Sequence, residues 1–220
     1  MADDFVVRCR NLCAGYGREI VLHDVTLDIP RGILLPFIGP NGAGKTTFLR
    51  TILGLLKPLS GALETPFHQS PPGCVSQQKA IDPLYPLTTR QVAAMGLYPR
   101  LSWWRLQSRE DKAAVSAALE LVGLLPHASK NYRELSGGMK QKALIARALV
   151  SGAEVLVMDE PTSELDEKSE REVFGHFRML CSEKGKTVLM ASHGLTDLSG
   201  AGELRHRALV DHGKVVLEGI

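Results

Sequence analysis

Cysteine is scarce in this chain of 220 residues, and its four copies are scattered along the sequence. Only Cys9 and Cys13 lie close together, and no second pair of metal-ligating side chains follows them at the spacing of a structural zinc site. We therefore interpret the cysteines as reduced thiols. The sequence also lacks a leader with a charged start, an apolar middle and small residues at its end, so it predicts a cytoplasmic location.

Long apolar runs and an excess of one charge are absent as well. No run approaches the roughly 20 apolar residues that a helix needs to cross a bilayer, so any link to a membrane has to run through a partner. The formal net charge is only +2, which gives no electrostatic argument for binding nucleic acid or an acidic membrane surface. Hydrophobic residues make up 44% of the chain, which excludes bulk disorder.

What the chain does have is an alternation of apolar runs and helical patterns, which predicts an α/β core with a largely parallel sheet. The first 30 residues differ from this pattern. Val25, Leu27 and Ile29 alternate with polar residues after a glycine-rich turn, as in a small antiparallel sheet. A hairpin with His212-Gly213 at its turn is expected near the end of the chain.

The middle of the chain changes to helical patterns. Thr88 and Gln91 have the spacing of a capping box, and Ser108 is expected to start a second helix. An apolar face recurs in that helix at helical spacing. We therefore divide the chain into three parts: an antiparallel β-subdomain with the first part of the core (1–76), an all-helical insertion (77–135) and the second part of the core (136–220).

Residues 39–46 read G-P-N-G-A-G-K-T and satisfy the full pattern of a phosphate-binding loop. Because a buried strand is predicted before the loop and a helix after it, this is more than a glycine-rich turn that happens to contain lysine. Lys45 is expected to bridge the β- and γ-phosphates of a nucleotide, and the Thr46 hydroxyl to hold Mg²⁺. The expected nucleotide-binding residues of the loop are Gly39, Pro40, Asn41, Gly42, Ala43, Gly44, Lys45, Thr46 and Thr47.

An apolar run at 155–158 ends in two acids, Asp159 and Glu160. A strand of this kind lies inside the sheet and delivers Asp159 at its carboxyl end, beside the phosphate loop. We expect Asp159 to hold Mg²⁺ and Glu160 to orient and polarise the attacking water. Alone, two acids after a strand fit a solvated turn equally well, and the phosphate loop upstream favours the catalytic interpretation.

LSGGMKQ at 135–141 separates this chain from kinases and small GTPases. Ser136, Gly137 and Gly138 open a predicted helix and so provide a second anion-binding helix start. A compact domain cannot easily bring both helix starts to one γ-phosphate. We therefore expect a head-to-tail homodimer, in which Ser136 of one copy covers the nucleotide that Lys45 of the other copy holds.

With these motifs in this order, the chain resembles the nucleotide-binding domain of ABC ATPases over essentially its whole length. GPNGAGKTT matches the Walker A motif, LSGGMKQ the signature, and VLVMDEPTSELD the Walker B stretch with its D-loop. The resemblance implies a P-loop NTPase (RecA-like) α/β core with a small antiparallel β-subdomain and an all-helical insertion. It also implies an ATPase that uses ATP and Mg²⁺.

The resemblance implies roles for four further residues. Tyr16 matches the aromatic residue that stacks on adenine, and Gln77 the glutamine that senses Mg²⁺ and the γ-phosphate, although its neighbour Gln78 leaves the register open. Asp166 matches the acid that contacts the opposite subunit, and His193 the histidine that contacts the γ-phosphate. Plain structural alternatives are a surface turn for Tyr16, a helix N-cap for Asp166 and a strand-end histidine for His193.

Three features depart from the family pattern. Pro36 lies inside the strand before the phosphate loop, where the missing N–H would weaken a central ladder. The stretch 61–77 is short, and Gly194 stands where an acid is usual. None of the three removes a catalytic group.

The resemblance narrows what such a motor drives. A single nucleotide-binding domain without a fused membrane segment is similar to a bacterial importer subunit, which works as two copies on separate permease subunits and with a substrate-binding protein. Residues 86–106 resemble the metal-ion and iron-chelate importer group. We therefore expect a subunit on the inner face of the cell membrane that drives import of metal ions or iron chelates.

Other classes of ATPase fit less well. A soluble ABC ATPase that drives assembly of a protein or cofactor scaffold is the alternative, because it would carry the same motifs. Fused pairs that act on ribosomes need two sets of motifs, and chromosome-organising types need long heptad arms, which this sequence lacks. A P-loop kinase or GTPase would not carry LSGG.

Overall fold

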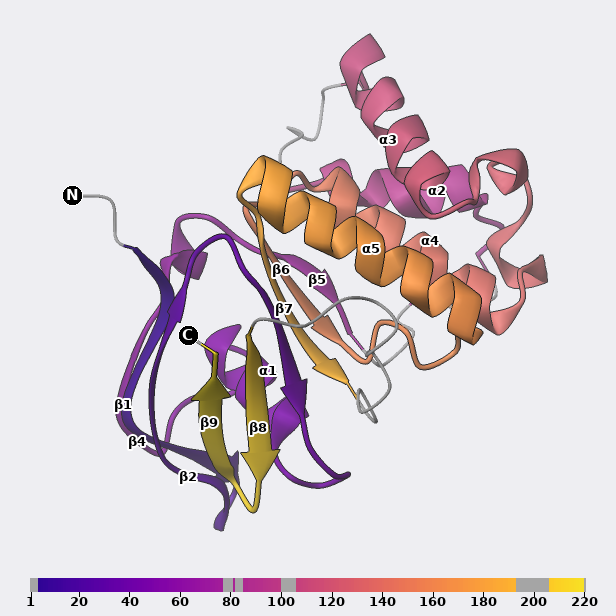
Figure 1. Ribbon diagram of the computed structural model, residues 1–220. Coiled ribbons are helices and arrows are strands. Elements are labelled where there is room, and N and C mark those ends of the chain that lie inside the picture. Colours follow the sequence, from indigo (N-terminus) through magenta and orange to yellow (C-terminus); the bar gives the residue numbers. More distant parts are fainter. Residues whose placement is uncertain (1–3, 77–80, 82–84, 100–105, 193–205, 220) are drawn as a thin grey trace.

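The computed structural model of the chain describes residues 4–76, 81, 85–99, 106–192 and 206–219. Two sheets and a group of helices make up this part of the molecule (Figure 1). A curved three-stranded sheet lies at one end, a six-stranded sheet runs through the middle, and most of the helices gather at the other end. This is the mixed α/β architecture that the sequence predicts.

The three-stranded sheet is antiparallel and has the order β2-β1-β4. Gly17, with a φ of 60°, makes the turn between the first two strands. Val25, Leu27 and Ile29 are at most 6% exposed, which confirms the predicted inward face. The third strand was not predicted, because its residues are mostly exposed and show no alternation. The bounds are β1 Phe5–Tyr16, β2 Glu19–Pro30 and β4 Ser60–Glu64.

The six-stranded sheet has the order β5-β6-β7-β3-β8-β9, and all neighbours are parallel except β8 and β9. Every residue of β6 and β7 is buried, which explains their apolar runs. The last two strands form the predicted hairpin, with His212 and Gly213 at φ 43° and 74°. The bounds are β5 Gly73–Val75, β6 Val155–Asp159, β7 Thr187–Ser192, β3 Leu34–Ile38, β8 Arg207–Asp211 and β9 Lys214–Glu218.

Pro36 is accommodated in the middle of β3. The Ile33 carbonyl accepts from Val188 N at 2.9 Å, on the β7 side of the strand. Backbone groups alternate along a strand, so the amide position of Pro36 faces the other neighbour, β8. Pairing with β8 begins only at Phe37, opposite Ala208. The missing N–H therefore falls where the ladder starts, and the expected weakening of a central ladder is avoided.

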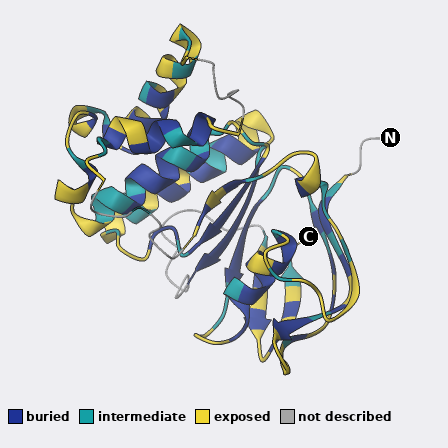
Figure 2. Cartoon of the chain, turned by 180° about the vertical axis from the view of Figure 1, so that it is seen from behind, coloured by how far each residue is buried: buried dark blue, intermediate teal, exposed yellow. Residues whose placement is uncertain are grey.

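Helix α1 (Lys45–Ile52) lies between the two sheets and packs against β1 and β2 on one side and β6 and β7 on the other. Phe48 of α1 is fully buried, and its ring centroid is 5.0 Å from that of Phe37 in β3. Figure 2 shows the central strands in the colour of buried residues, between the helices and the antiparallel sheet. The helix that follows the phosphate loop is thus fixed in the core of the molecule.

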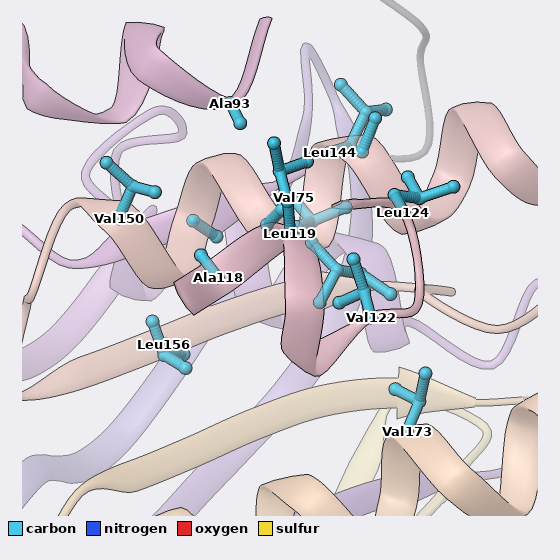
Figure 3. Packing of buried hydrophobic residues seen from close by; sticks show 14 of the residues in the cluster. Val75, Ala93, Ala118, Leu119, Val122, Leu124, Leu144, Val150, Leu156 and Val173 are labelled. Carbon is cyan, nitrogen blue, oxygen red and sulfur yellow. The ribbon is translucent and has the colours of Figure 1, made fainter. Parts of the chain in front are cut away.

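The described residues between β5 and the signature motif form helices, as expected for an all-helical insertion. Thr88 and Ser108 cap their helices, each with a complete capping box. Val75, Ala93, Leu119 and Leu144 come from four different elements and meet in one apolar cluster (Figure 3). The bounds are α2 Thr89–Ala94, η2 Met95–Leu97, α3 Arg109–Leu121, η3 Leu125–His127, η4 Tyr132–Glu134 and α4 Gly137–Val150.

One long helix, α5, and one short 3₁₀ turn, η1, complete the described elements. Helix α5 (Glu167–Lys184) packs on β7 and β3 and ends at Gly185, whose φ is 61°. A 3₁₀ turn, η1 (Pro66–His68), precedes β5. Helix α4 packs against α2 and α3 although the proposed division ends the insertion at residue 135. That three-part division of the chain stays a prediction.

Candidate nucleotide-binding site

The loop between β3 and α1 is built on glycines that other parts of the backbone approach closely. A Cβ on Gly39 would lie 1.9 Å from the Val210 carbonyl oxygen, and one on Gly44 would lie 2.8 Å from Leu22 Cδ2. Gly44 also has a φ of 108°, which disfavours any side chain. Side chains are therefore excluded at Gly39 and Gly44, and the loop leads into Lys45, the first residue of α1, where unpaired helix amides attract an anion.

The Lys45 side chain is 4% exposed, and its ammonium group turns back onto the loop. Nζ donates to the carbonyl oxygens of Gly39 at 2.6 Å and Pro40 at 2.8 Å. Burial lowers the pKa of Lys45, and the nearby Glu160 and Asp159 carboxylates oppose that shift. A buried cation is therefore held beside two acids at the end of β6.

Asp159 lies at the carboxyl end of β6, as predicted, and is 9% exposed. Its Oδ1 accepts a hydrogen bond from Thr46 Oγ1 at 3.1 Å. Burial raises the pKa of the Asp159 carboxyl, the Thr46 hydrogen bond lowers it, and Glu160 raises it further. A buried carboxylate beside a hydroxyl supplies the oxygen ligands that Mg²⁺ prefers.

Glu160 has a φ of 50°, which is uncommon for a residue other than glycine. Its backbone N–H donates to the Ala191 carbonyl at 3.1 Å, and its own carbonyl accepts from Gln141 Nε2 at 3.3 Å. Gln141 is 4% exposed, and the sequence reasoning did not single it out. Its contact with Glu160 joins residues 19 apart in the sequence, so no local pattern predicts it.

These groups meet at one cavity of about 480 Å³. Its wall combines backbone amides at a helix start, one cation, hydroxyls and a carboxylate, a set that fits the phosphates of a nucleotide together with Mg²⁺. Asp159, behind Thr46, completes the oxygen ligands. The lining residues are Asn41, Gly42, Gly44, Lys45, Thr46, Thr47 and Glu160.

The second helix start lies elsewhere on the chain. Ser136 is the N-cap of α4, and its Oγ accepts from Met139 N at 3.3 Å. A Cβ on Gly137 would lie 2.4 Å from Glu164 Oε2, and one on Gly138 would lie 2.9 Å from the Glu164 carbonyl oxygen. Ser136, Gly137 and Gly138 are not among the described residues that line the 480 Å³ cavity. One copy of the chain does not bring its two helix starts to the same cavity.

The remaining predicted site residues are placed only in part. Asp166 caps α5, accepting from Ser169 N at 2.9 Å and Ser169 Oγ at 3.0 Å, which lowers its pKa. Tyr16, at the end of β1, is 44% exposed and accepts a hydrogen bond from an Arg50 nitrogen at 3.4 Å. Gln77, Gln78, His193 and Gly194 lie outside the described residues.

Comparison with known proteins identifies the family. The model of the ABC transporter family matches residues 22–163, a stretch that contains the phosphate loop, the signature motif and both acids. The chain belongs to the ABC transporter family. The manganese transport system ATP-binding protein MntB of Bacillus subtilis is 36% identical to this ABC protein over 196 residues, covering 87% of this chain and 78% of the relative.

Solved structures agree with the fold. An inward-facing ABC transporter assigned to the metal-chelate type matches with a TM-score of 0.83 and 25% identity, over 97% of this chain and 82% of that chain. A dimeric ATP-binding cassette in a post-hydrolysis state with ADP and Pi matches with a TM-score of 0.82 and 27% identity, over 97% and 98%. The chain is an ATP-binding subunit of an ABC transporter and an ATPase. Among the helices that the structure describes, none is long and apolar enough to cross a membrane.

Proposed function

We propose that two copies of this chain close head-to-tail around ATP and drive the import of metal ions or iron chelates through a separate membrane permease. The observation that carries the dimer is the separation of the two helix starts: Lys45 lines the cavity, and Ser136 of the same chain does not. A second copy supplies the missing Ser136, Gly137 and Gly138. The dimeric cassette with ADP and Pi supports this arrangement.

Each residue of the cavity has a role in hydrolysis under this proposal. The amides at the start of α1 bind the phosphates, and the Lys45 ammonium leaves the Gly39 and Pro40 carbonyls to bridge the β- and γ-phosphates. Thr46 and Asp159 would hold Mg²⁺, which when bound neutralises charge on the phosphate oxygens. Glu160 orients the attacking water and takes its proton.

The family resemblance implies roles for four further residues. Tyr16 stacks on the adenine ring. The ring either rotates while its hydroxyl keeps the 3.4 Å hydrogen bond from Arg50, or that hydrogen bond breaks. Asp166 contacts the opposite subunit, Gln77 senses Mg²⁺ and the γ-phosphate, and His193 holds the γ-phosphate.

The relatives support the proposed location and cargo. A cytoplasmic subunit on the inner face of the membrane, working with permease subunits and a substrate-binding protein, fits the manganese transport protein and the metal-chelate type transporter. No observation favours the alternative of a soluble ATPase for scaffold assembly. The net charge of +2 gives no support to a nucleic-acid partner.

The test is capture of the tagged chain from detergent-solubilised membranes of the source organism. We expect a permease with several membrane spans to co-purify, and a strain without this chain to lose uptake of labelled manganese or of an iron chelate. A soluble partner with no permease would instead support assembly. Uptake that is unchanged in the deleted strain for metal ions and chelates alike would refute the cargo.

A further inference from the structure

A buried glutamine on α4 contacts the residue that is proposed to be the base. Gln141 is 4% exposed, and its Nε2 donates to the Glu160 carbonyl at 3.3 Å. A buried amide needs such a partner, because its donors are removed from water. Gln141 belongs to α4 and Glu160 to the turn that follows β6, so the hydrogen bond joins two separate parts of the fold.

The Glu160 carbonyl also accepts from Ser163. The Ser163 N–H donates to it at 3.4 Å and the Ser163 Oγ at 3.2 Å. Ser163 belongs to the same turn as Glu160, so these two bonds shape the turn and move with it. The bond from Gln141 has a different consequence, because it comes from a helix of 14 residues outside the turn. It fixes Glu160 relative to α4.

The backbone of Glu160 is held from two sides in an uncommon conformation. Its φ of 50° costs free energy in a residue with a Cβ and persists only where the surroundings fix it. The N–H donates to the Ala191 carbonyl of β7 at 3.1 Å, and the carbonyl accepts from Gln141 of α4. The two peptide planes that flank Glu160 set the direction of its Cβ. They therefore determine where its side chain enters the 480 Å³ cavity that it lines.

Helix α4 supports the segment after β6 at further places as well. A Cβ on Gly137 would lie 2.4 Å from Glu164 Oε2, and one on Gly138 would lie 2.9 Å from the Glu164 carbonyl oxygen. Lys142 Nζ donates to Ser169 Oγ, in the first turn of α5, at 2.9 Å. The start of α4 thus contacts the segment from Glu160 to α5 at its beginning, middle and end.

We propose that Gln141 is a positioning residue for Glu160, whose carbonyl it holds so that the carboxylate is aligned with the attacking water. This inference rests on the proposed function, which makes Glu160 the base. Gln141 is not among the described residues that line the cavity, so it acts on the backbone of Glu160 and not on the nucleotide. A small displacement of a general base lowers the rate, because proton transfer requires hydrogen-bond geometry.

Gln141→Met tests the role of the amide, because it keeps the length of the side chain and removes the donor. We expect kcat for ATP hydrolysis to fall about 10-fold, while ATP affinity in a calorimetric titration stays within about twofold of wild type. Gln107→Met, at an exposed position before α3, is the matched control. Wild-type kcat in Gln141→Met, or weaker ATP binding without a loss of kcat, would overturn the proposal.

The combination with Glu160→Gln tests whether Gln141 acts through the base. In a chain without the carboxylate, Gln141→Met should change the residual turnover less than about twofold, because no base remains to be positioned. A further drop of about 10-fold on that background would assign Gln141 a structural role and overturn the proposal. Wild-type turnover in Glu160→Gln alone would refute the base of the proposed function. A strong defect in Glu160→Gln with wild-type turnover in Gln141→Met would refute only this inference.

A dimer with one working site shows in which copy Gln141 acts. Lys45→Ala in one copy and Ser136→Arg in the other leave one site intact, and Glu160 of that site belongs to the Ser136→Arg copy. Gln141→Met should lower turnover about 10-fold when it is in the Ser136→Arg copy. It should have no further effect in the Lys45→Ala copy, whose own site is already inactive. A loss from the Lys45→Ala copy of equal or greater size would mean that Gln141 holds Ser136 over the partner's nucleotide, and would overturn the proposal.

Discussion

The chain has two helices whose first amides are expected to meet phosphate, and their surroundings differ. At the start of α1, the cavity brings together Lys45, Thr46 and Glu160, with Asp159 hydrogen-bonded behind. At the start of α4, Ser136 makes an ordinary N-cap, and the two glycines after it pack close to Glu164. Among the described residues, a cation and two acids thus meet at the start of α1, whereas Glu164 is the charged side chain beside the start of α4.

The difference indicates a division of labour between copies of the chain. The cavity at α1 is lined by the residues proposed to bind and hydrolyse ATP, and the signature residues of the same chain are not among its described lining residues. The α4 site offers a capped helix start whose bare glycines permit close approach of another surface. Each site is thus half of an arrangement that a symmetric dimer would complete twice.

Glu160→Gln should have the largest effect, because it removes the proposed base from the α1 site and leaves the cavity wall otherwise intact. We expect ATP turnover to fall by about 10²–10⁴-fold while ATP still binds, so that the closed dimer accumulates. Phosphate release and size-exclusion chromatography with ATP measure the two effects. Glu172→Gln, on the exposed face of α5, is the matched control. Wild-type turnover in Glu160→Gln would contradict the base assignment.

Lys45→Ala tests binding at the α1 site. A charged hydrogen bond contributes about 1.5–3 kcal/mol, so we expect ATP affinity to fall about 10- to 100-fold in a calorimetric titration. Lys168→Ala removes an exposed lysine from α5 and should leave the affinity unchanged. If ATP binds Lys45→Ala as tightly as wild type, the lysine does not hold phosphate.

A mixture of two inactive variants tests whether each nucleotide site is formed by two copies of the chain. Lys45→Ala inactivates the half of the site that α1 contributes, and Ser136→Arg inactivates the half that α4 contributes. In a head-to-tail heterodimer both defects fall in one site and the other is intact, so a 1:1 mixture should recover turnover, up to about a quarter of wild type. Each variant mixed with itself is the control. A mixture no more active than its components would mean that each chain uses its own Ser136.

Sequence patterns predicted the elements that carry an apolar face or a capping motif at regular spacing. The inward face of β2 and the capping boxes at Thr88 and Ser108 followed from local spacing and are confirmed. Strand β4 was missed because, as a largely exposed edge strand, it has no apolar alternation to reveal it. The tolerance of Pro36 could not be predicted, since it depends on where β8 starts to pair.

The sequence predicted the part of the candidate site that consists of motifs at the ends of parallel strands. The phosphate loop and the acids of β6 come together because parallel strands end at the same edge of the sheet. The bond from Gln141 to the Glu160 carbonyl joins residues 19 apart in sequence, and the positive φ of Glu160 is set by tertiary packing. Neither is encoded in a local pattern.

The smallest expected effects concern stability, and they should have opposite signs at the two helix starts. Asp159→Asn keeps an acceptor for Thr46 and removes a buried charge, so the melting temperature of the nucleotide-free chain should rise, by about 2–4 °C for each 1 kcal/mol recovered. Ser136→Ala removes a helix cap and should lower it, at a cost of about 0.5–2 kcal/mol.

The pH dependence of these two stability changes distinguishes the removal of a buried charge from the loss of a helix cap. Because burial raises the pKa of Asp159, its ionisation costs stability as pH rises through that pKa, and below its usual value of 3.8 the carboxyl is neutral in both folded and unfolded chains. The gain from Asp159→Asn should therefore be present at pH 7 and vanish in acid, whereas the loss from Ser136→Ala should persist at both. Calorimetry at both pH values measures this. A gain from Asp159→Asn that persists below pH 3.8 would mean that the buried charge is not its cause.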